Sequence, residues 1–364
     1  MLIINGMAWE SPQYTVNQVK KAGSLYIDSS AEFSERLKSL DVINNWRASH
    51  QYPLNIITDG LRKKSYKIEP KRLVAQRIKR LPAIEAKLKK ESMKLNQMQD
   101  IGGCRVVFSD IDSVHELVKN YKRYNPQTKE SDYLSKPRSS GYRGIHLIHK
   151  YHSDKQMQSA YNGLQIEMQI RTLKQHIWAT AVETVGFFID QPLKQAQGDK
   201  NWQRFFALMS CVIARQEGCA LVPETPHNHD ELVVEIKKYN NKLGALGNLL
   251  MYGRAVKITQ EGAIKGKHYF LMQLDSKGRR MTIHSYPKES AAAAQDAYQR
   301  AEQSAPDDEN VLLVSADSFA ALKKAYPNYF HDTQKFVTLL SVFLNVDQCY
   351  FSRLHFFANY HAYE

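Results

Sequence analysis

An alternating segment near the middle of the chain constrains the fold most strongly. Apolar side chains occupy every second position from Leu164 to Ile170, and polar or charged side chains lie between them. Because successive side chains of a β-strand point to opposite faces, the pattern predicts a strand with one wholly apolar face. The other face carries Glu167, Gln169 and Arg171. Such a face ordinarily turns to water; alternatively it lines a cleft, with Glu167 on a metal ion and Arg171 on a phosphate.

Helical periodicity and turn residues predict the elements around this strand. The expected helices span 31–40, 56–95 with an interruption near Pro82, 172–188, 202–220, 231–251 and 289–304. Pro53 is expected to break the chain ahead of the second of these. Short strands are expected at 105–108 and 310–314, and a hairpin at 268–286. Two short helices should flank Pro327. The last hundred residues therefore predict a small α+β arrangement.

Positive charge is concentrated in one part of the chain. The net charge is +13, and the segment from Leu61 to Lys94 holds thirteen Lys or Arg against three Glu. A local field of this kind attracts phosphates, either of a nucleotide or of RNA. The alternative explanation is a solvated helix face.

Several protein classes are disfavoured by composition. No apolar run is long enough to cross a membrane, and the first ten residues lack the basic and apolar regions of a secretory signal. The four cysteines form no Cys-x-x-Cys pair, which favours buried free thiols over a zinc site. We therefore expect a cytoplasmic protein with no membrane association.

Four motifs occur in order between residues 77 and 179. They are Arg77-Ile-Lys79 with Lys87; Asp100-Ile-Gly-Gly-Cys-Arg105; Tyr133-Leu-Ser-Lys-Pro-Arg138-Ser-Ser-Gly-Tyr142-Arg-Gly-Ile-His146; and Glu167-Met-Gln169-Ile-Arg171-Thr172 with His176 and Trp178-Ala179. Each motif alone is weak. Their order and spacing together resemble the RelA/SpoT synthetase domain, closely over residues 60–190. The resemblance implies an α+β fold in which helices flank a mixed, nucleotidyltransferase-like sheet.

The resemblance also implies a donor site for ATP. Asp100 and Glu167 match the acidic pair that binds Mg²⁺, a cation that prefers oxygen ligands. Glu167 is in addition a candidate to accept the proton of the attacking hydroxyl. Arg77 matches the arginine that stacks on adenine, and Lys79 and Lys87 match cations on the donor phosphates.

The remaining matched positions belong to the cleft, and the resemblance defines their individual roles less specifically. Tyr142 matches the tyrosine that stacks on the acceptor base. Arg105 fits either a phosphate contact or a structural ion pair. Taken singly, every motif residue also has an ordinary structural explanation, such as a loop aromatic or a core histidine. The other cleft positions are His146, Gln169, Arg171 and His176.

The residues expected to bind the acceptor nucleotide differ from the usual pattern of the family. Members that make (p)ppGpp usually carry lysines where this chain has Ser131 and Arg138. Some toxin members lack these contacts and pyrophosphorylate the 3′-terminal adenosine of tRNA instead. A tRNA acceptor is therefore the first hypothesis. A small alarmone synthetase acting on GDP, GTP or an adenosine nucleotide is the second, and a catalytically silent RNA-binding regulator is the third.

The tail resembles the C-terminal half of CapRel proteins, the fused toxin–antitoxin branch of the family. The matching stretch runs from Ala325 to Thr333 and contains Tyr326 and Tyr329. The resemblance implies a zinc-free, zinc-finger-like domain that inhibits the synthetase until a phage protein, often capsid protein, binds it. Tyr329 is the candidate blocker of the adenine site, supported by Tyr326. The predicted division is a synthetase domain at 1–230, a connector at 231–257 and an antitoxin domain at 258–364.

Overall fold

The computed structural model forms two compact units, and each is discontinuous in sequence. One unit contains Met1–Asp132, Gly144–Leu173 and Lys257–Tyr326, and the other contains Tyr133–Arg143, Lys174–Val256 and Pro327–Glu364. We refer to them as the sheet unit and the helical unit. The structure describes residues 2–4, 7–124, 128–189, 191, 193, 197–252, 257–261, 268–275, 280–305, 309–316, 318–325 and 333–344.

The sheet unit holds all of the described strands. Its strands are β1 Leu2–Ile4, β2 Met7–Trp9, β3 Leu73–Ile78, β4 Gly102–Phe108, β5 Lys129–Asp132, β6 Ile145–Lys150, β7 Gln165–Thr172, β8 Lys257–Glu261, β9 His268–Asp275, β10 Arg280–Pro287 and β11 Glu309–Ala316. Its helices are α1 Val16–Ile27, α2 Phe33–Ser49, α3 Gln51–Ile68, α4 Leu81–Lys90, α5 Ile111–Tyr124, α10 Ala291–Ser304 and α11 Phe319–Ala325, with short 3-10 turns at Leu95–Gln97, Ser159–Tyr161 and Lys288–Ser290.

Nine of these strands form one mixed sheet, in the order β5-β6-β7-β4-β3-β11-β9-β10-β8. Strands β4 and β7 run parallel, with Gly103 beside Glu167, whereas β3 pairs antiparallel with both β4 and β11. The alternation predicted for residues 164–171 is confirmed as β7, where Ile166, Met168 and Ile170 are all fully buried. The predicted fold class, an α+β arrangement with helices flanking a mixed sheet, is also confirmed.

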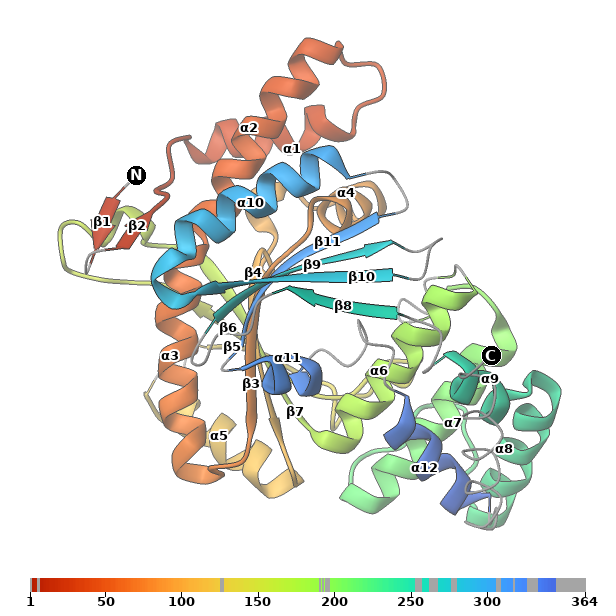
Figure 1. Ribbon diagram of the computed structural model, residues 1–364. Coiled ribbons are helices and arrows are strands. Elements are labelled where there is room, and N and C mark those ends of the chain that lie inside the picture. The colour runs from red at the N-terminus through yellow and green to blue at the C-terminus, as the bar shows by residue number, and fades with distance from the viewer. Residues whose placement is uncertain are drawn as a thin grey trace. The chain divides into compact units, whose positions relative to one another are not determined.

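Helices from both ends of the chain pack on this sheet (Figure 1). Helices α3 and α5 lie against the strands β3, β4 and β7 that carry the motifs. Helix α10 lies along β9, β10 and β11, and α11 packs against β3 and β11. Strands β9–β11 of the predicted C-terminal domain thus continue the sheet that carries the motifs. As a functional division of the chain, the boundaries at residues 230 and 257 stay a prediction.

The helical unit has its own aromatic core. Its helices are α6 Leu173–Phe188, which starts at the last residue of the sheet unit, α7 Lys200–Glu217, α8 His229–Leu243, α9 Ala245–Tyr252 and α12 Gln334–Phe343. Trp178, Phe205, Phe206 and Phe336 are buried together in it. The Asp199 carboxylate caps α7 by accepting hydrogen bonds from two backbone N–H groups, and Gly218 ends the helix in the left-handed conformation.

Two local predictions are wrong. The long helix expected over 56–95 is interrupted by strand β3, because Leu73–Ile78 pairs with β4 and β11 on its two sides. Pro53, expected to interrupt the chain, lies instead in the first turn of α3, where proline costs no helical hydrogen bond. Among the described residues, no helix has the length and apolar character needed to cross a membrane.

The adjacent Gly102 and Gly103 provide a matched test of the packing at the start of β4. A Cβ atom on Gly102 would lie 2.6 Å from the Ile166 Cδ1 atom and 3.6 Å from the Cβ atoms of His50 and Leu54, whereas one on Gly103 would approach only the Glu167 carbonyl, at 3.9 Å. We expect Gly102→Ala to lower the free energy of unfolding by about 1–3 kcal/mol. Gly103→Ala should change it by less than about 1 kcal/mol. Urea unfolding measures both, and equal losses would contradict the packing described.

Candidate active site

A partly buried cluster of opposite charges lies where β3 ends and β4 begins. Asp100 precedes β4 and accepts from the ammonium groups of Lys79, at 2.6 Å, and Lys87, at 3.1 Å. Lys79 directly follows β3, and Lys87 lies on α4. The side chains of all three retain between 15% and 24% of their exposure, so the cluster is shielded but still reachable from solvent.

Electrostatics keep Asp100 ionised. Burial acts to raise the pKa of its carboxyl group, but Lys79 and Lys87 outweigh burial and hold that pKa below its usual value. Burial lowers the pKa of the Lys79 ammonium, and Asp100 opposes this change. The two lysines together bring more positive charge than one carboxylate neutralises. The cluster therefore suits an anionic ligand such as a phosphate chain.

A second carboxylate, Glu167, lies on the polar face of β7. It accepts hydrogen bonds from His146 Nδ1 at 2.9 Å and from Gln169 Nε2 at 2.8 Å. His146 lies on β6, directly across from Gln169 in the antiparallel register. Burial acts to raise the pKa of the Glu167 carboxyl group, but the hydrogen bond and charge of His146 outweigh burial and lower the pKa overall. Glu167 is therefore a carboxylate at neutral pH.

The two carboxylates interact electrostatically, since the charge of Asp100 acts to raise the pKa of Glu167. Two carboxylates sharing one region offer the oxygen ligands that Mg²⁺ prefers when phosphates complete its coordination. Within the described residues, three or more His, Cys, Asp or Glu side chains do not gather anywhere in a metal-binding group. Mg²⁺ binding by Asp100 and Glu167 stays a prediction.

The other predicted donor residues flank this centre. Arg77 is half-buried near the end of β3, and its charge acts on Lys79. Arg105 is half-buried on β4, in the middle of the same sheet. Arg171 lies near the end of β7 with 2% of its surface exposed, so it reaches a ligand only if the site opens. The structure thus brings Arg77, Lys79, Lys87 and Arg105 onto neighbouring elements, and their role as a donor site stays a prediction.

Predicted acceptor residues also occur in the helical unit. Arg138 donates to the Tyr133 hydroxyl at 2.8 Å and lies over the Tyr133 ring, 4.7 Å from its centroid. The rings of Tyr133 and Tyr142 meet edge to face at 5.7 Å. Tyr142 and His176 are buried, at 6% and 2% exposure. Tyr133 belongs to the same motif as Arg138 and Tyr142 but was not predicted as a site residue.

Other predicted residues lie away from this centre or outside the described residues. Tyr326, Tyr329 and Cys349 lie outside the described residues. Cys104 and Cys211 are free and buried, and Cys219 is free and partly buried. A hollow of about 340 Å³ lies between residues 9–14, α2 and α10, and it is lined by none of the predicted site residues.

Comparison with known families identifies the segment that carries this geometry. Residues 76–185 match the model described as the region found in RelA / SpoT proteins. This segment is similar to the region found in RelA / SpoT proteins. It contains the predicted residues from Arg77 to His176, so the resemblance inferred from the four motifs is confirmed for this part of the chain. The finer resemblance to the CapRel branch stays a prediction.

Two curated relatives each match about a third of the chain. GTP pyrophosphokinase YjbM of Bacillus subtilis (strain 168) is 32% identical over 124 residues, which are 32% of this chain and 57% of that protein. GTP pyrophosphokinase YwaC of the same organism is 24% identical over 132 residues, or 34% of this chain and 62% of that protein. The chain therefore spans less than two thirds of the length of either relative.

Two solved structures align with just under half of the chain. The small alarmone synthetase 2 of Bacillus subtilis aligns with 48% of this chain and 93% of its own, at 20% identity and a TM-score of 0.41. The small alarmone synthetase 1 of the same organism, bound to its product pppGpp, aligns with 46% of this chain and 89% of its own, at 22% identity and a TM-score of 0.40.

The lowered pKa of Asp100 predicts how acid affects stability. A carboxyl group whose pKa is depressed in the folded state stabilises the fold above its unfolded pKa, near pH 4, and loses this contribution as the pH falls. Asp100→Asn should therefore be less stable than wild type near pH 7, and the difference should shrink toward about pH 2. Urea unfolding without nucleotide measures it. Asp154→Asn is the control, since that side chain is 98% exposed, and an Asp100→Asn difference independent of pH would contradict the prediction.

Proposed function

We propose that this chain is a pyrophosphokinase that transfers the terminal pyrophosphate of ATP to a ribose hydroxyl group. The observation that carries the proposal is the cluster of Asp100 with two lysines, beside a second carboxylate on the neighbouring strand. Phosphoryl-type transfer needs cations that position the donor phosphates and neutralise developing charge. The named relatives, both GTP pyrophosphokinases, support the same chemistry.

Lys79 and Lys87 bind the donor phosphates in this proposal. Each exchanges its contact with Asp100 for a phosphate oxygen, and the loss of both contacts frees the Asp100 oxygens. A Mg²⁺ ion held by Asp100 and Glu167 would supply positive charge to the phosphates. Arg77 packs on the adenine, and Arg105 remains available to the phosphates.

Glu167 orients the reaction at the acceptor hydroxyl. Its lowered pKa keeps it ionised, which suits a charged anchor and makes it a modest proton acceptor. The hydrogen bonds from His146 and Gln169 fix both carboxylate oxygens in direction. Tyr142, Arg138, Arg171 and His176 keep, as part of this proposal, the acceptor roles expected from their motifs.

We propose the 3′-terminal adenosine of tRNA as the acceptor. Ser131 lies on β5 and offers no positive charge for the phosphates of a free guanosine nucleotide. Exposed cations on and around α3 and α4 would contact an RNA backbone. These cations are Lys63, Lys67, Lys71, Lys89, Lys90 and Lys94. GDP or GTP is the second candidate acceptor, since the named relatives are GTP pyrophosphokinases.

We propose that the tail regulates this activity. Tyr329, supported by Tyr326, blocks the adenine site until a phage protein binds the tail and shifts the equilibrium toward an open state. The proposal makes the chain a self-inhibited toxin of anti-phage defence. Its support is the tail motif from Ala325 to Thr333.

The transfer reaction can be tested with γ-labelled ATP, Mg²⁺ and either bulk tRNA or a GDP/GTP mixture. We expect label on tRNA, and we expect Glu167→Gln to reduce labelling by about 100-fold or more. Asp154→Asn should label as wild type does, because its carboxylate lies in solvent. Label on guanosine nucleotides alone would establish the second candidate acceptor. Label on neither, from wild type and Tyr329→Ala alike, would contradict the proposed activity.

The blocking model predicts a gain of activity. Tyr329→Ala should raise both basal labelling and growth inhibition in cells, because the adenine site becomes free without a trigger. Tyr124→Ala is the control, since this tyrosine on α5 is 75% exposed. Unchanged or lower activity of Tyr329→Ala would contradict the blocking model while leaving the transfer reaction in place.

A further inference from the structure

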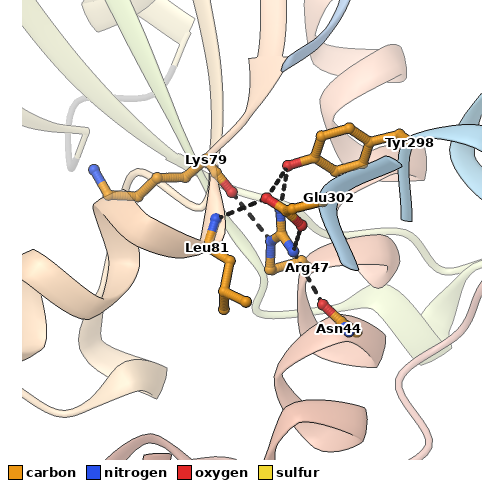
Figure 2. A network of polar contacts seen from close by, with 6 residues as sticks. All are labelled: Asn44, Arg47, Lys79, Leu81, Tyr298 and Glu302. Carbon is orange, nitrogen blue, oxygen red and sulfur yellow. Dashed lines mark hydrogen bonds and ion pairs between the residues drawn. The ribbon is translucent and has the colours of Figure 1, made fainter. Parts of the chain in front are cut away.

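A fully buried guanidinium group joins two helices of the sheet unit that are far apart in the sequence, α2 and α10 (Figure 2). Arg47 of α2 pairs with both carboxylate oxygens of Glu302 on α10, at 2.7 and 3.1 Å. It also donates to the Asn44 side chain at 3.0 Å and, through Nε, to the Lys79 carbonyl oxygen at 3.1 Å. The side chains of Arg47 and Glu302 are only 2% and 10% exposed.

The Glu302 carboxylate also contacts the main chain beyond Lys79. Its Oε1 atom accepts from the Leu81 N–H group at 3.1 Å and from the Tyr298 hydroxyl at 2.6 Å. Arg47 in turn donates to the Tyr298 hydroxyl. The carbonyl of residue 79 and the N–H of residue 81 are therefore both held by one ion pair, as Figure 2 shows.

The segment held in this way carries a residue of the donor site. The Lys79 side chain leaves the same residue in another direction and reaches Asp100 at 2.6 Å. A short segment fixed by two main-chain hydrogen bonds limits the positions that its side chain can sample, because those bonds remove freedom of the backbone. Charge-assisted bonds to a buried carboxylate and guanidinium are the stronger kind of such contacts.

We propose that Glu302 and Arg47 are positioning residues for Lys79, so that helix α10 completes the donor half of the site. This inference rests on the proposed pyrophosphate transfer. The C-terminal part of the chain then has a supporting role that is separate from inhibition by Tyr329. It also follows that the donor site needs β11 and α10 in place, since β11 pairs with β3 at Arg77.

The test uses the full chain with Glu302→Gln, which keeps the size of the side chain and removes its charge. We expect the dissociation constant for a non-hydrolysable ATP analogue and the KM for ATP to rise about tenfold. The KM for the acceptor should change less than about twofold, because only the donor half is affected. A merely structural role would lower the active fraction, and with it kcat, while leaving the KM for ATP and the analogue's dissociation constant unchanged.

Two further variants make the test specific. Glu235→Gln removes a comparable bidentate pair, with Arg204 at 2.7 and 2.9 Å in the helical unit, and should leave ATP binding unchanged. Tyr298→Phe removes only the hydroxyl that donates to Glu302, and should produce a smaller rise in the same direction. Tyr298→Phe decides the question if Glu302→Gln does not fold.

A double-mutant cycle on analogue binding decides whether Glu302 acts through Lys79. In a Lys79→Met background, Glu302→Gln should have no further effect, because the side chain that it positions is gone. A full tenfold effect in that background, or none in the wild-type background, would overturn the inference. If wild type and Tyr329→Ala both bind the analogue without transferring pyrophosphate, the proposed function alone is overturned, and the binding cycle still decides the inference. Failure of both wild type and Tyr329→Ala to bind the analogue would overturn both.

Discussion

The parallel pairing of β4 with β7 is the constraint on which the site depends. It places Gly103 beside Glu167, so that the acidic residue before one strand and the acidic residue within the other share one region of the sheet. A parallel pair requires a long crossover connection, which here contains α5, β5 and β6. That same connection returns His146 to β7, where it binds Glu167. One pairing therefore brings the carboxylates together and orients one of them.

Charge compensation explains how such a site is stable without its ligand. Two buried carboxylates near one another repel, and each is costly to bury alone. Lys79 and Lys87 neutralise Asp100, whereas His146 and Gln169 stabilise Glu167 by hydrogen bonds. The groups that stabilise Asp100 in the free protein are those proposed to bind phosphate. Ligand binding then replaces ion pairs that already exist, so little new charge has to be buried.

Local alternation predicted β7, because periodicity is a property of neighbouring positions. The candidate site residues were assigned from the order and spacing of four motifs, and their roles stay a prediction. Strand β3 was missed because Leu73–Ile78 is short and lies inside a charged stretch that favours helix, and only its pairing with β4 and β11 makes it a strand. The contact of Arg47 with Glu302 joins residues 255 positions apart. No local pattern marks such a pair, since each residue alone resembles an ordinary charge on an amphipathic helix.

The buried Arg47–Glu302 pair also restricts the proposed regulation by the tail. Separating a buried ion pair leaves an uncompensated charge and typically costs about 3–5 kcal/mol, so a switch of modest energy would leave α10 on the sheet. Helix α10 and strand β11 would therefore stay in place in both states, and movement would be confined to the chain beyond α11. Tyr326 and Tyr329 belong to that later part. A trigger protein would then need to move only the end of the tail, while the segment that carries Lys79 keeps its geometry.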